Sequence, residues 1–214
     1  MKSVATLILL TGQCCFAHAS PFQNGSFELI NSVPPITGSC RAFNAVTGST
    51  QITGWTVSVG NVDWRGAPIR GCFWTPSDGS VSLGLVGLGG GGVGGIEQTF
   101  DTVPGKTYVV AFDLAGDIAA PPIVKPLAVT IDGATTIFTF DTTGRSIIDM
   151  GWTTHGIRFT AIGTSSTIRF VSDVTTSGGT LDAGAALDNV QITLHPDDAI
   201  AGIPLDCGHT GAPA

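Results

Sequence analysis

The chain has 214 residues, of which 9 are Lys or Arg and 16 are Asp or Glu, so its formal net charge is −7 at pH 7. This acidic, charge-poor composition lacks the basic patch typical of proteins that bind nucleic acid or anionic membranes. We therefore expect no nucleic-acid partner, and a neutral polymer or a divalent cation is the more compatible ligand.

The first nineteen residues have the three parts of a secretory signal peptide. Lys2 precedes an apolar run from Val4 to Leu10, and Ala17-His18-Ala19 forms a cleavage site before Ser20. The apolar run is shorter than the roughly 20 residues that a membrane-spanning helix needs. We expect a signal peptide over residues 1–19, a secreted extracellular protein, and no membrane span.

The rest of the chain predicts short strands and almost no helix, because β-branched and aromatic runs alternate with turn-forming residues. The segment Val103-Pro104-Gly105-Lys106 fits a type II turn, and Asp132-Gly133 is a hairpin signal. In the two IRF segments, Ile157, Phe159, Ile168 and Phe170 should point inward and the arginines outward. The predicted strands are Gly25–Ile30, Ile52–Val57, Val81–Leu85, Ile96–Phe100, Thr107–Ala115, Leu127–Ile131, Thr135–Phe140, Thr153–Thr160, Thr167–Ser172 and Ala185–Leu194. This spacing predicts an all-β sandwich or barrel over residues 20–195, followed by a flexible tail over residues 196–214.

Three cysteines follow the signal peptide: Cys40, Cys72 and Cys207. In an exported protein, two of them are expected to pair. We predict a disulfide between Cys40 and Cys72, because both flank one aromatic-rich segment, and it would contribute about 3–4 kcal/mol. Cys207 lies in the tail, where it is either free or pairs between chains.

Residues 84–95 read GLVGLGGGGVGG, which raises the question of a phosphate-binding loop. Such loops lie between a strand and a helix and often carry a lysine. Here the segment joins two predicted strands, and no Lys or Arg occurs from Gly84 to Asp101. We therefore exclude a nucleotide site and interpret Gly87–Val93 as a flexible insertion.

Seven motifs occur in a familiar order: NGSFE, ITGWTV, GGIEQTF, PGKTYVVAFDLAGD, FTFDTTGRS, MGWTTHGIRFTA and ALDNVQIT. Together they resemble the choice-of-anchor C family of bacterial exported proteins and its plant cell-wall relatives, the domain of unknown function 642 family. The resemblance implies a galactose-binding-like jelly-roll β-sandwich, a fold shared with many carbohydrate-binding modules. The short polar tail departs from the anchors of that family and favours secretion over surface attachment.

The resemblance also implies a structural Ca²⁺ ion where the first and last motifs meet. Glu28 and Asp188 would be the carboxylate ligands, and backbone carbonyls near Ser26 and Lys106 would complete the shell. Ca²⁺ takes about six to eight oxygen ligands in irregular geometry, which such a site supplies. The alternative is that both carboxylates accept hydrogen bonds from a neighbouring turn.

Candidate sugar-binding residues concentrate in the segment VDWRGAPIRGCFWTPSDG. Aromatic rings stack on sugar rings while polar groups bind hydroxyls. The candidates are Asp63, Trp64, Arg65, Phe73 and Trp74. The alternative for the two tryptophans is a small core beneath a long loop.

The only two glutamates, Glu28 and Glu97, raise the question of a glycosidase, which needs two positioned carboxyl groups. The sequence identifies no group that would perturb the pKa of either glutamate, and the histidines fit no catalytic motif. We therefore expect a non-catalytic protein that binds cell-wall or extracellular polysaccharide. The alternative is a structural or adhesive matrix protein that binds other proteins or itself, with Cys207 as a bridge between chains.

Overall fold

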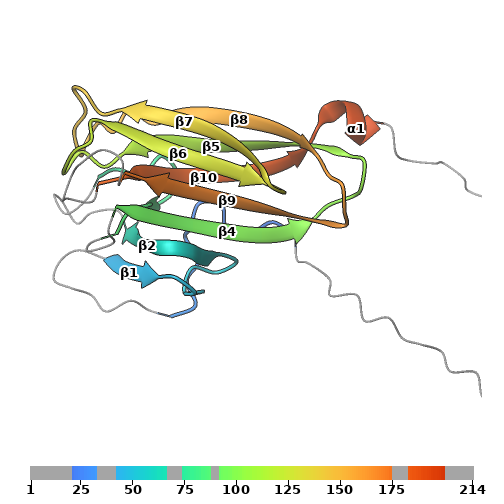
Figure 1. Cartoon of the computed structure of the whole chain (residues 1–214), viewed down its shortest axis with the longest axis horizontal. Helices are drawn as coiled ribbons and strands as arrows, with labels where there is room; N and C mark the ends of the chain where they lie inside the picture. The colour runs from blue at the N-terminus through green and yellow to red at the C-terminus, as the bar shows by residue number, and fades with distance from the viewer. Residues whose placement is uncertain (1–20, 33–41, 67–73, 88–91, 175–182, 201–214) are drawn as a thin grey trace, which may run out of the picture.

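The structure is a computed structural model that describes residues 21–32, 42–66, 74–87, 92–174 and 183–200. Ten strands and one short helix occur in these ranges (Figure 1). They are β1 (Ala42–Val46), β2 (Thr56–Gly66), β3 (Val81–Gly84), β4 (Val93–Asp101), β5 (Thr107–Gly116), β6 (Val124–Ile131), β7 (Ala134–Asp141), β8 (Thr153–Thr160), β9 (Ser165–Asp173), β10 (Ala185–Leu194) and α1 (Pro196–Ile200). All the strand pairs are antiparallel.

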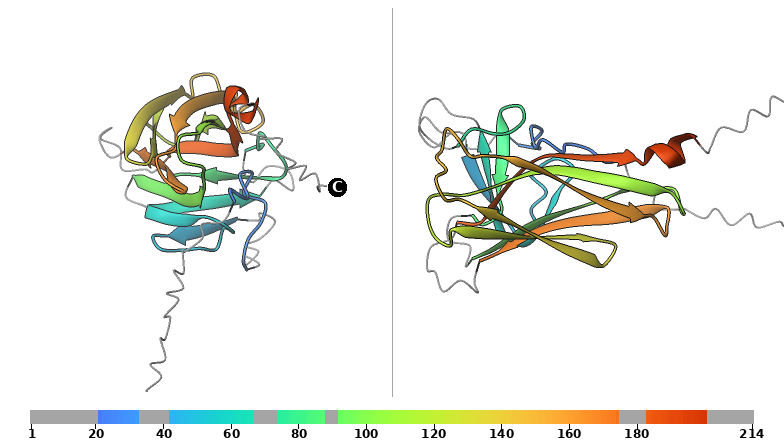
Figure 2. Two further views of the ribbon diagram at one scale, coloured as in Figure 1. Left: turned by 90° about the vertical axis from the view of Figure 1, so that its right-hand side faces the viewer. Right: turned by 90° about the horizontal axis from the view of Figure 1, so that it is seen from above.

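The strands form two sheets that share β2. The first sheet has the order β7-β6-β9-β4-β2, and the second continues as β2-β3-β10-β5-β8 with β1 also paired to β2. Figure 2 looks along the strands in its left view and shows the sheets curled around a common interior. This is the jelly-roll β-sandwich that the resemblance implied.

Strand β2 passes from one sheet to the other at Gly60. Residues before it pair with β4, and residues after it pair with β1 and β3. Gly60 has a φ of 59°, and a Cβ there would overlap the carbonyl group of Val93. A glycine is therefore required where the strand bends so close to β4.

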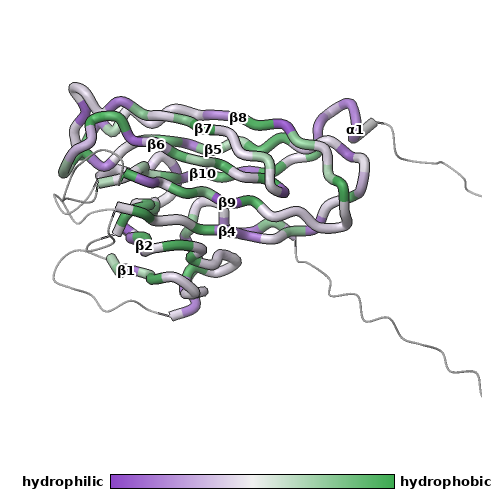
Figure 3. Tube along the Cα trace, in the orientation of Figure 1, coloured by the Kyte–Doolittle hydropathy of each residue, from purple (hydrophilic) through white to green (hydrophobic). Residues whose placement is uncertain are grey.

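The core lies between the sheets, where inward-facing apolar side chains from both layers meet. Phe112 of β5 contacts Phe170 of β9, with ring centroids 5.4 Å apart, and Trp55 lies 6.2 Å from the same Phe170 ring. Ile168 and Phe170 are fully buried while Arg169 between them is not, so the predicted alternation in this strand is confirmed. Figure 3 shows hydrophilic residues gathered at turns and around α1.

Most predicted strands are confirmed within a few residues, and two of them, β8 and β10, have the predicted bounds. The predicted strand over residues 25–30 is wrong. Asn24 and Phe27 have φ values of 55° and 60°, and only Ile30 forms a bridge, to Ile52. Positive φ values interrupt an extended strand, so this segment is an irregular chain that buries the Phe27 side chain in the core.

Two further segments differ from prediction. Residues 42–46 form β1, which was not predicted, and β2 continues to Gly66 and so includes the first five residues of the proposed sugar-binding segment. The start of the predicted flexible tail is helical in α1. There the Asp198 carboxylate accepts a hydrogen bond from the Thr107 amide at 2.7 Å and pairs with Lys106 at 3.7 Å.

The predicted turns are confirmed. Gly105 has a φ of 79°, and the Lys106 amide donates to the Val103 carbonyl, as a type II turn requires. Asp132 and Gly133 both have positive φ and join β6 to β7 as a two-residue hairpin. Within the described part of the chain, no helix has the length and apolar character needed to cross a membrane.

Candidate functional site

The two carboxylates assigned to calcium bind one turn, residues 77–80, from opposite ends. Asp188 accepts hydrogen bonds from the amides of Ser77 and Asp78 at 2.9 and 3.0 Å. Glu28 accepts from the Ser80 amide at 2.6 Å and from its hydroxyl at 2.7 Å. These contacts are the alternative that the sequence analysis left open for both residues.

Asp188 is fully buried, and this burial sets its protonation. Burial raises the pKa of Asp188 to about 6, although the amide donors of Asp78, Asn189 and Ser77 lower it. Desolvation therefore outweighs three hydrogen bonds. The result is a buried carboxyl group that backbone amide dipoles hold in place.

The predicted calcium ligands do not fit as a set. The Lys106 carbonyl accepts a hydrogen bond from the Ala161 amide, and Lys106 precedes β5, seven residues before Asp113, which is paired with Asp188. At about 3.3 Å per residue, Lys106 lies roughly 20 Å from Asp188. Among the described residues, no group of three or more His, Cys, Asp or Glu side chains is arranged to hold a metal ion.

The two tryptophans proposed for sugar stacking lie in the core. Trp64 is 1% exposed, stacks on Phe43 and donates its indole N–H to the Phe27 carbonyl at 2.9 Å. Trp74 is 3% exposed and donates to the Ser82 hydroxyl at 2.7 Å. Neither ring has a face open to a ligand, which corrects the stacking assignment in favour of the core alternative.

Asp63 and Arg65 belong to an ionic chain rather than to an open site. Arg65 pairs with Asp63 at 2.9 Å and with Asp117 at 3.2 Å, and its guanidinium lies 4.1 Å from the ring centroid of Trp74. Asp63 also accepts from the Asn44 side chain at 2.8 Å. Phe73, Cys40, Cys72 and Cys207 lie outside the described residues.

Lys125 lies in the interior of the sandwich, close to Asp117 of this ionic chain. Its side chain has no exposed surface, and its ammonium donates to the carbonyls of Ala120 and Ala183 at 2.6 and 2.7 Å. Burial lowers the pKa of Lys125 to about 8, and the nearby Asp117 carboxylate partly opposes this effect. The group joins β6 to two loop segments and does not face solvent.

The outer face of the first sheet, by contrast, carries a cross-strand row of polar side chains. Register places five residues side by side on adjacent strands: Thr135, Thr130, Arg169, Glu97 and Thr56. The Thr130 and Thr135 hydroxyls hydrogen-bond at 2.8 Å. With strands about 4.8 Å apart, this polar row extends roughly 19 Å across the sheet.

Arg169 is the only positive side chain in the polar row, and its neighbours hold it in place. Its Nε atom donates to the Ser58 hydroxyl at 2.9 Å and lies 3.9 Å from a Glu97 carboxylate oxygen. The side chains of Arg169 and Glu97 are each 40% exposed. Both charged groups therefore remain accessible to a ligand while keeping a defined orientation.

A second row is apolar and lies two residues along β4, β6, β7 and β9, and three residues along β2, where a bulge shifts the register. It consists of Ile137, Ala128, Val171, Gly95 and Val59. A Cβ at Gly95 would lie 2.8 Å from a Val171 methyl group and 3.1 Å from one of Val59, so glycine lets the two valines approach each other. The apolar row therefore lies beside the polar row on the same face of the sheet.

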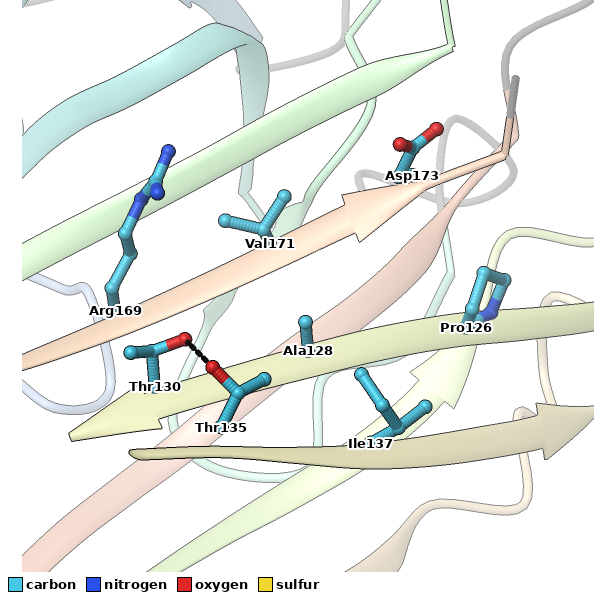
Figure 4. Close-up of a pocket in the computed structure, with 8 residues that line it drawn as sticks. All are labelled: Pro126, Ala128, Thr130, Thr135, Ile137, Arg169, Val171 and Asp173. Carbon is cyan, nitrogen blue, oxygen red and sulfur yellow. Dashed lines mark hydrogen bonds between the residues drawn. The ribbon is translucent and has the colours of Figure 1, made fainter. Parts of the chain in front are cut away.

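The two rows border a groove of about 450 Å³ (Figure 4). Its lining residues are Pro126, Ala128, Thr130, Thr135, Ile137, Arg169, Val171 and Asp173. Small side chains occupy the middle of the groove, and Arg169 and Asp173 lie toward its ends on β9 (Figure 4). Hydroxyl, guanidinium and carboxylate groups thus surround an apolar strip, an arrangement that matches the hydroxyl and CH groups of a sugar chain.

The groove was not predicted from the sequence. The one sequence feature that pointed to the groove was the outward orientation predicted for the arginines in the IRF segments, and the position of Arg169 confirms that orientation. The remaining members come from strands up to 113 positions apart in the sequence, from Thr56 to Arg169, and only the strand register brings them together. The two glutamates have separate partners: Glu28 binds the 77–80 turn and Glu97 lies beside Arg169.

Similar proteins include a segment of "Halomucin" from Haloquadratum walsbyi, 31% identical over 200 residues, which are 91% of this chain and 2% of that protein. A family 35 carbohydrate-binding module from Clostridium thermocellum shares 15% identity with a TM-score of 0.37, covering 71% of this chain and 91% of the module. The CBM22-1 xylan-binding domain of Paenibacillus barcinonensis Xyn10C shares 16% identity with a TM-score of 0.42, covering 72% of this chain and 92% of the domain.

The family model described as "Protein of unknown function (DUF642)" matches residues 20–193. This range includes all ten strands, except for the last residue of β10, and both rows of the groove. The chain therefore belongs to the DUF642 family, because that family's model matches it from residue 20 to residue 193.

Proposed function

We propose that this protein is a secreted, non-catalytic polysaccharide-binding protein, and that the polysaccharide binds in the groove on the outer face of the first sheet. The observation that carries the proposal is the pair of cross-strand rows, one polar and one apolar, beside a groove of about 450 Å³. A sugar chain lying across the strands would place CH groups over the apolar row and hydroxyls against the polar row. No aromatic stacking is needed for this mode.

Charge favours a neutral polysaccharide over an anionic one. Among the described residues that line the groove, Arg169 is the only cation, and the carboxylate of Glu97 lies 3.9 Å from it. Asp173 adds a second carboxylate to the lining, and the whole chain is acidic, at −7. An anionic polymer would therefore meet repulsion at both short and long range.

The test is retention on insoluble neutral polysaccharides, followed by affinity electrophoresis in soluble ones. Ala128→Trp places a large ring on the small residue in the middle of the groove, so we expect retention to be lost while the melting temperature stays close to that of the wild type. Arg169→Ala should weaken binding by about tenfold, the effect of losing one or two hydrogen bonds to a charged group.

The matched control is Ala111→Trp. Ala111 is also partly buried on a central strand and faces outward, but it belongs to the second sheet, where it is paired with Gly156. This variant should retain wild-type binding. Binding that survives Ala128→Trp and Arg169→Ala would show that the polysaccharide site lies elsewhere.

A further inference from the structure

Strand β7 is an edge of the first sheet, and among the described strands it pairs only with β6. Its residues 134–140 carry no charge, and Ile137 at its centre is 62% exposed. Of the other two edge strands, β8 carries Arg158 and His155, and β1 is only 5 residues long. Exposed edges are usually protected by charges, prolines or short length, because free backbone groups invite pairing with another strand. β7 has none of these protections between Ala134 and Phe140.

The hairpin between β6 and β7 determines which backbone groups of β7 are free. Asp132 and Gly133 have φ values of 47° and 90°, as in a type I′ turn, and Ile131 is paired with Ala134. This closing pair exchanges both of its hydrogen bonds. Hydrogen-bonded and non-bonded pairs alternate along an antiparallel ladder, so the even-numbered residues of β7 bond to β6.

The odd-numbered residues Thr135, Ile137 and Thr139 consequently direct their N–H and C=O groups to the open edge. Their order, Thr-x-Ile-x-Thr, reads the same in both directions. An antiparallel copy of the strand would set Ile137 against itself and Thr135 against Thr139 of the second copy. Each of these three pairs would exchange two hydrogen bonds across a two-fold axis.

We propose that two copies of this chain associate through antiparallel pairing of their β7 strands, with the two-fold axis at Ile137. The charge distribution supports a second copy of this chain as the partner of β7. A chain with a net charge of −7 meets itself with least repulsion at an uncharged segment. In the proposed register, Asp141 at the end of the strand faces Gly133 of the second copy, so no carboxylates oppose each other.

The pairing has a consequence for the groove, because Thr135 and Ile137 line it. The first sheets of the two copies would join edge to edge, and their grooves would lie on one extended face. A long polysaccharide could then contact both grooves at once, which raises apparent affinity without any new contact within a chain. This consequence rests on the proposed function, whereas the pairing itself does not.

The test measures mass by sedimentation velocity and light scattering over a range of concentrations, in the presence of a reductant. The reductant removes any disulfide through Cys207 as an explanation. The wild type should be a dimer. Ile137→Lys places two like charges directly opposite each other, so we expect the dissociation constant to rise by about tenfold or more. Ile148→Lys, at a residue that is 83% exposed outside the strands, is the matched control and should remain dimeric.

Hydrogen exchange on the wild type gives a second measurement that needs no variant. The amides of Thr135, Ile137 and Thr139 should be protected at high concentration and lose that protection on dilution. A reduced wild type that is monomeric at every concentration, or an Ile137→Lys protein as dimeric as the control, would overturn the proposal. A monomer that still binds polysaccharide through the groove would leave the proposed function intact.

Discussion

Replacing Lys125 by methionine should change how stability depends on pH. In the folded protein the pKa of Lys125 is lowered to about 8 from its ordinary value of 10.5, because the side chain is buried. Between about pH 8 and pH 10.5, Lys125 is therefore protonated in the unfolded chain but largely deprotonated in the folded chain. The free energy of unfolding therefore rises with pH across this window.

The magnitude follows from the difference between the two pKa values. A pKa lowered from 10.5 to about 8 corresponds to about 3 kcal/mol in total. Of this, about 2 kcal/mol should appear between pH 7 and 9.5, since the transition is still incomplete at the upper limit. Methionine has a similar length and no charge, so this contribution should be absent from Lys125→Met.

Urea unfolding followed by tryptophan fluorescence at several pH values measures the effect. The unfolding free energy of the wild type should rise relative to Lys125→Met as the pH increases from 7 to 9.5. Lys106→Met is the control, because it removes one lysine that is 28% exposed and paired with Asp198. If the wild-type and Lys125→Met profiles run parallel, the reasoning that burial perturbs this lysine is refuted.

Two further predictions concern packing and calcium. Gly94→Ala should lower the free energy of unfolding by about 3 kcal/mol or more, because a Cβ there would overlap the carbonyls of Leu85 and Asn61. The control is Gly156→Ala, where the nearest atom to an added Cβ is 3.7 Å away. Thermal melts should show that this control costs less than about 1 kcal/mol. Since amide donors already bind Glu28 and Asp188, we expect EDTA to leave the melting temperature unchanged. A melting temperature that falls with EDTA and recovers with Ca²⁺ would instead support the calcium site implied by the resemblance.

Several features of the fold could be predicted from the sequence because their causes are local. Alternation placed Ile168 and Phe170 in the core and Arg169 on the surface, and these positions are confirmed. Turn chemistry located the Asp132-Gly133 hairpin, since both positions need positive φ. The motif order identified the family, which the family model confirms over residues 20–193.

The candidate site could not be predicted in the same way. Composition made Trp64 and Trp74 resemble exposed binding residues, but β2 continues into the start of that segment and places Trp64 in the core. Short local patterns do not show which face of a strand a partner sheet will cover. Likewise, nothing near Lys125 in the sequence indicates that its ammonium will meet the carbonyl of Ala183.

Thus the sequence by itself determined the strand content, the turn positions and the family, each of which depends on residues close together in the chain. Only the tertiary structure decided that Glu28 and Asp188 bind one turn and that Arg169 lies between Glu97 and Thr130. The reason is physical: the register between distant strands comes from packing of the whole core. A shift of one residue would turn every side chain of a strand to the opposite face.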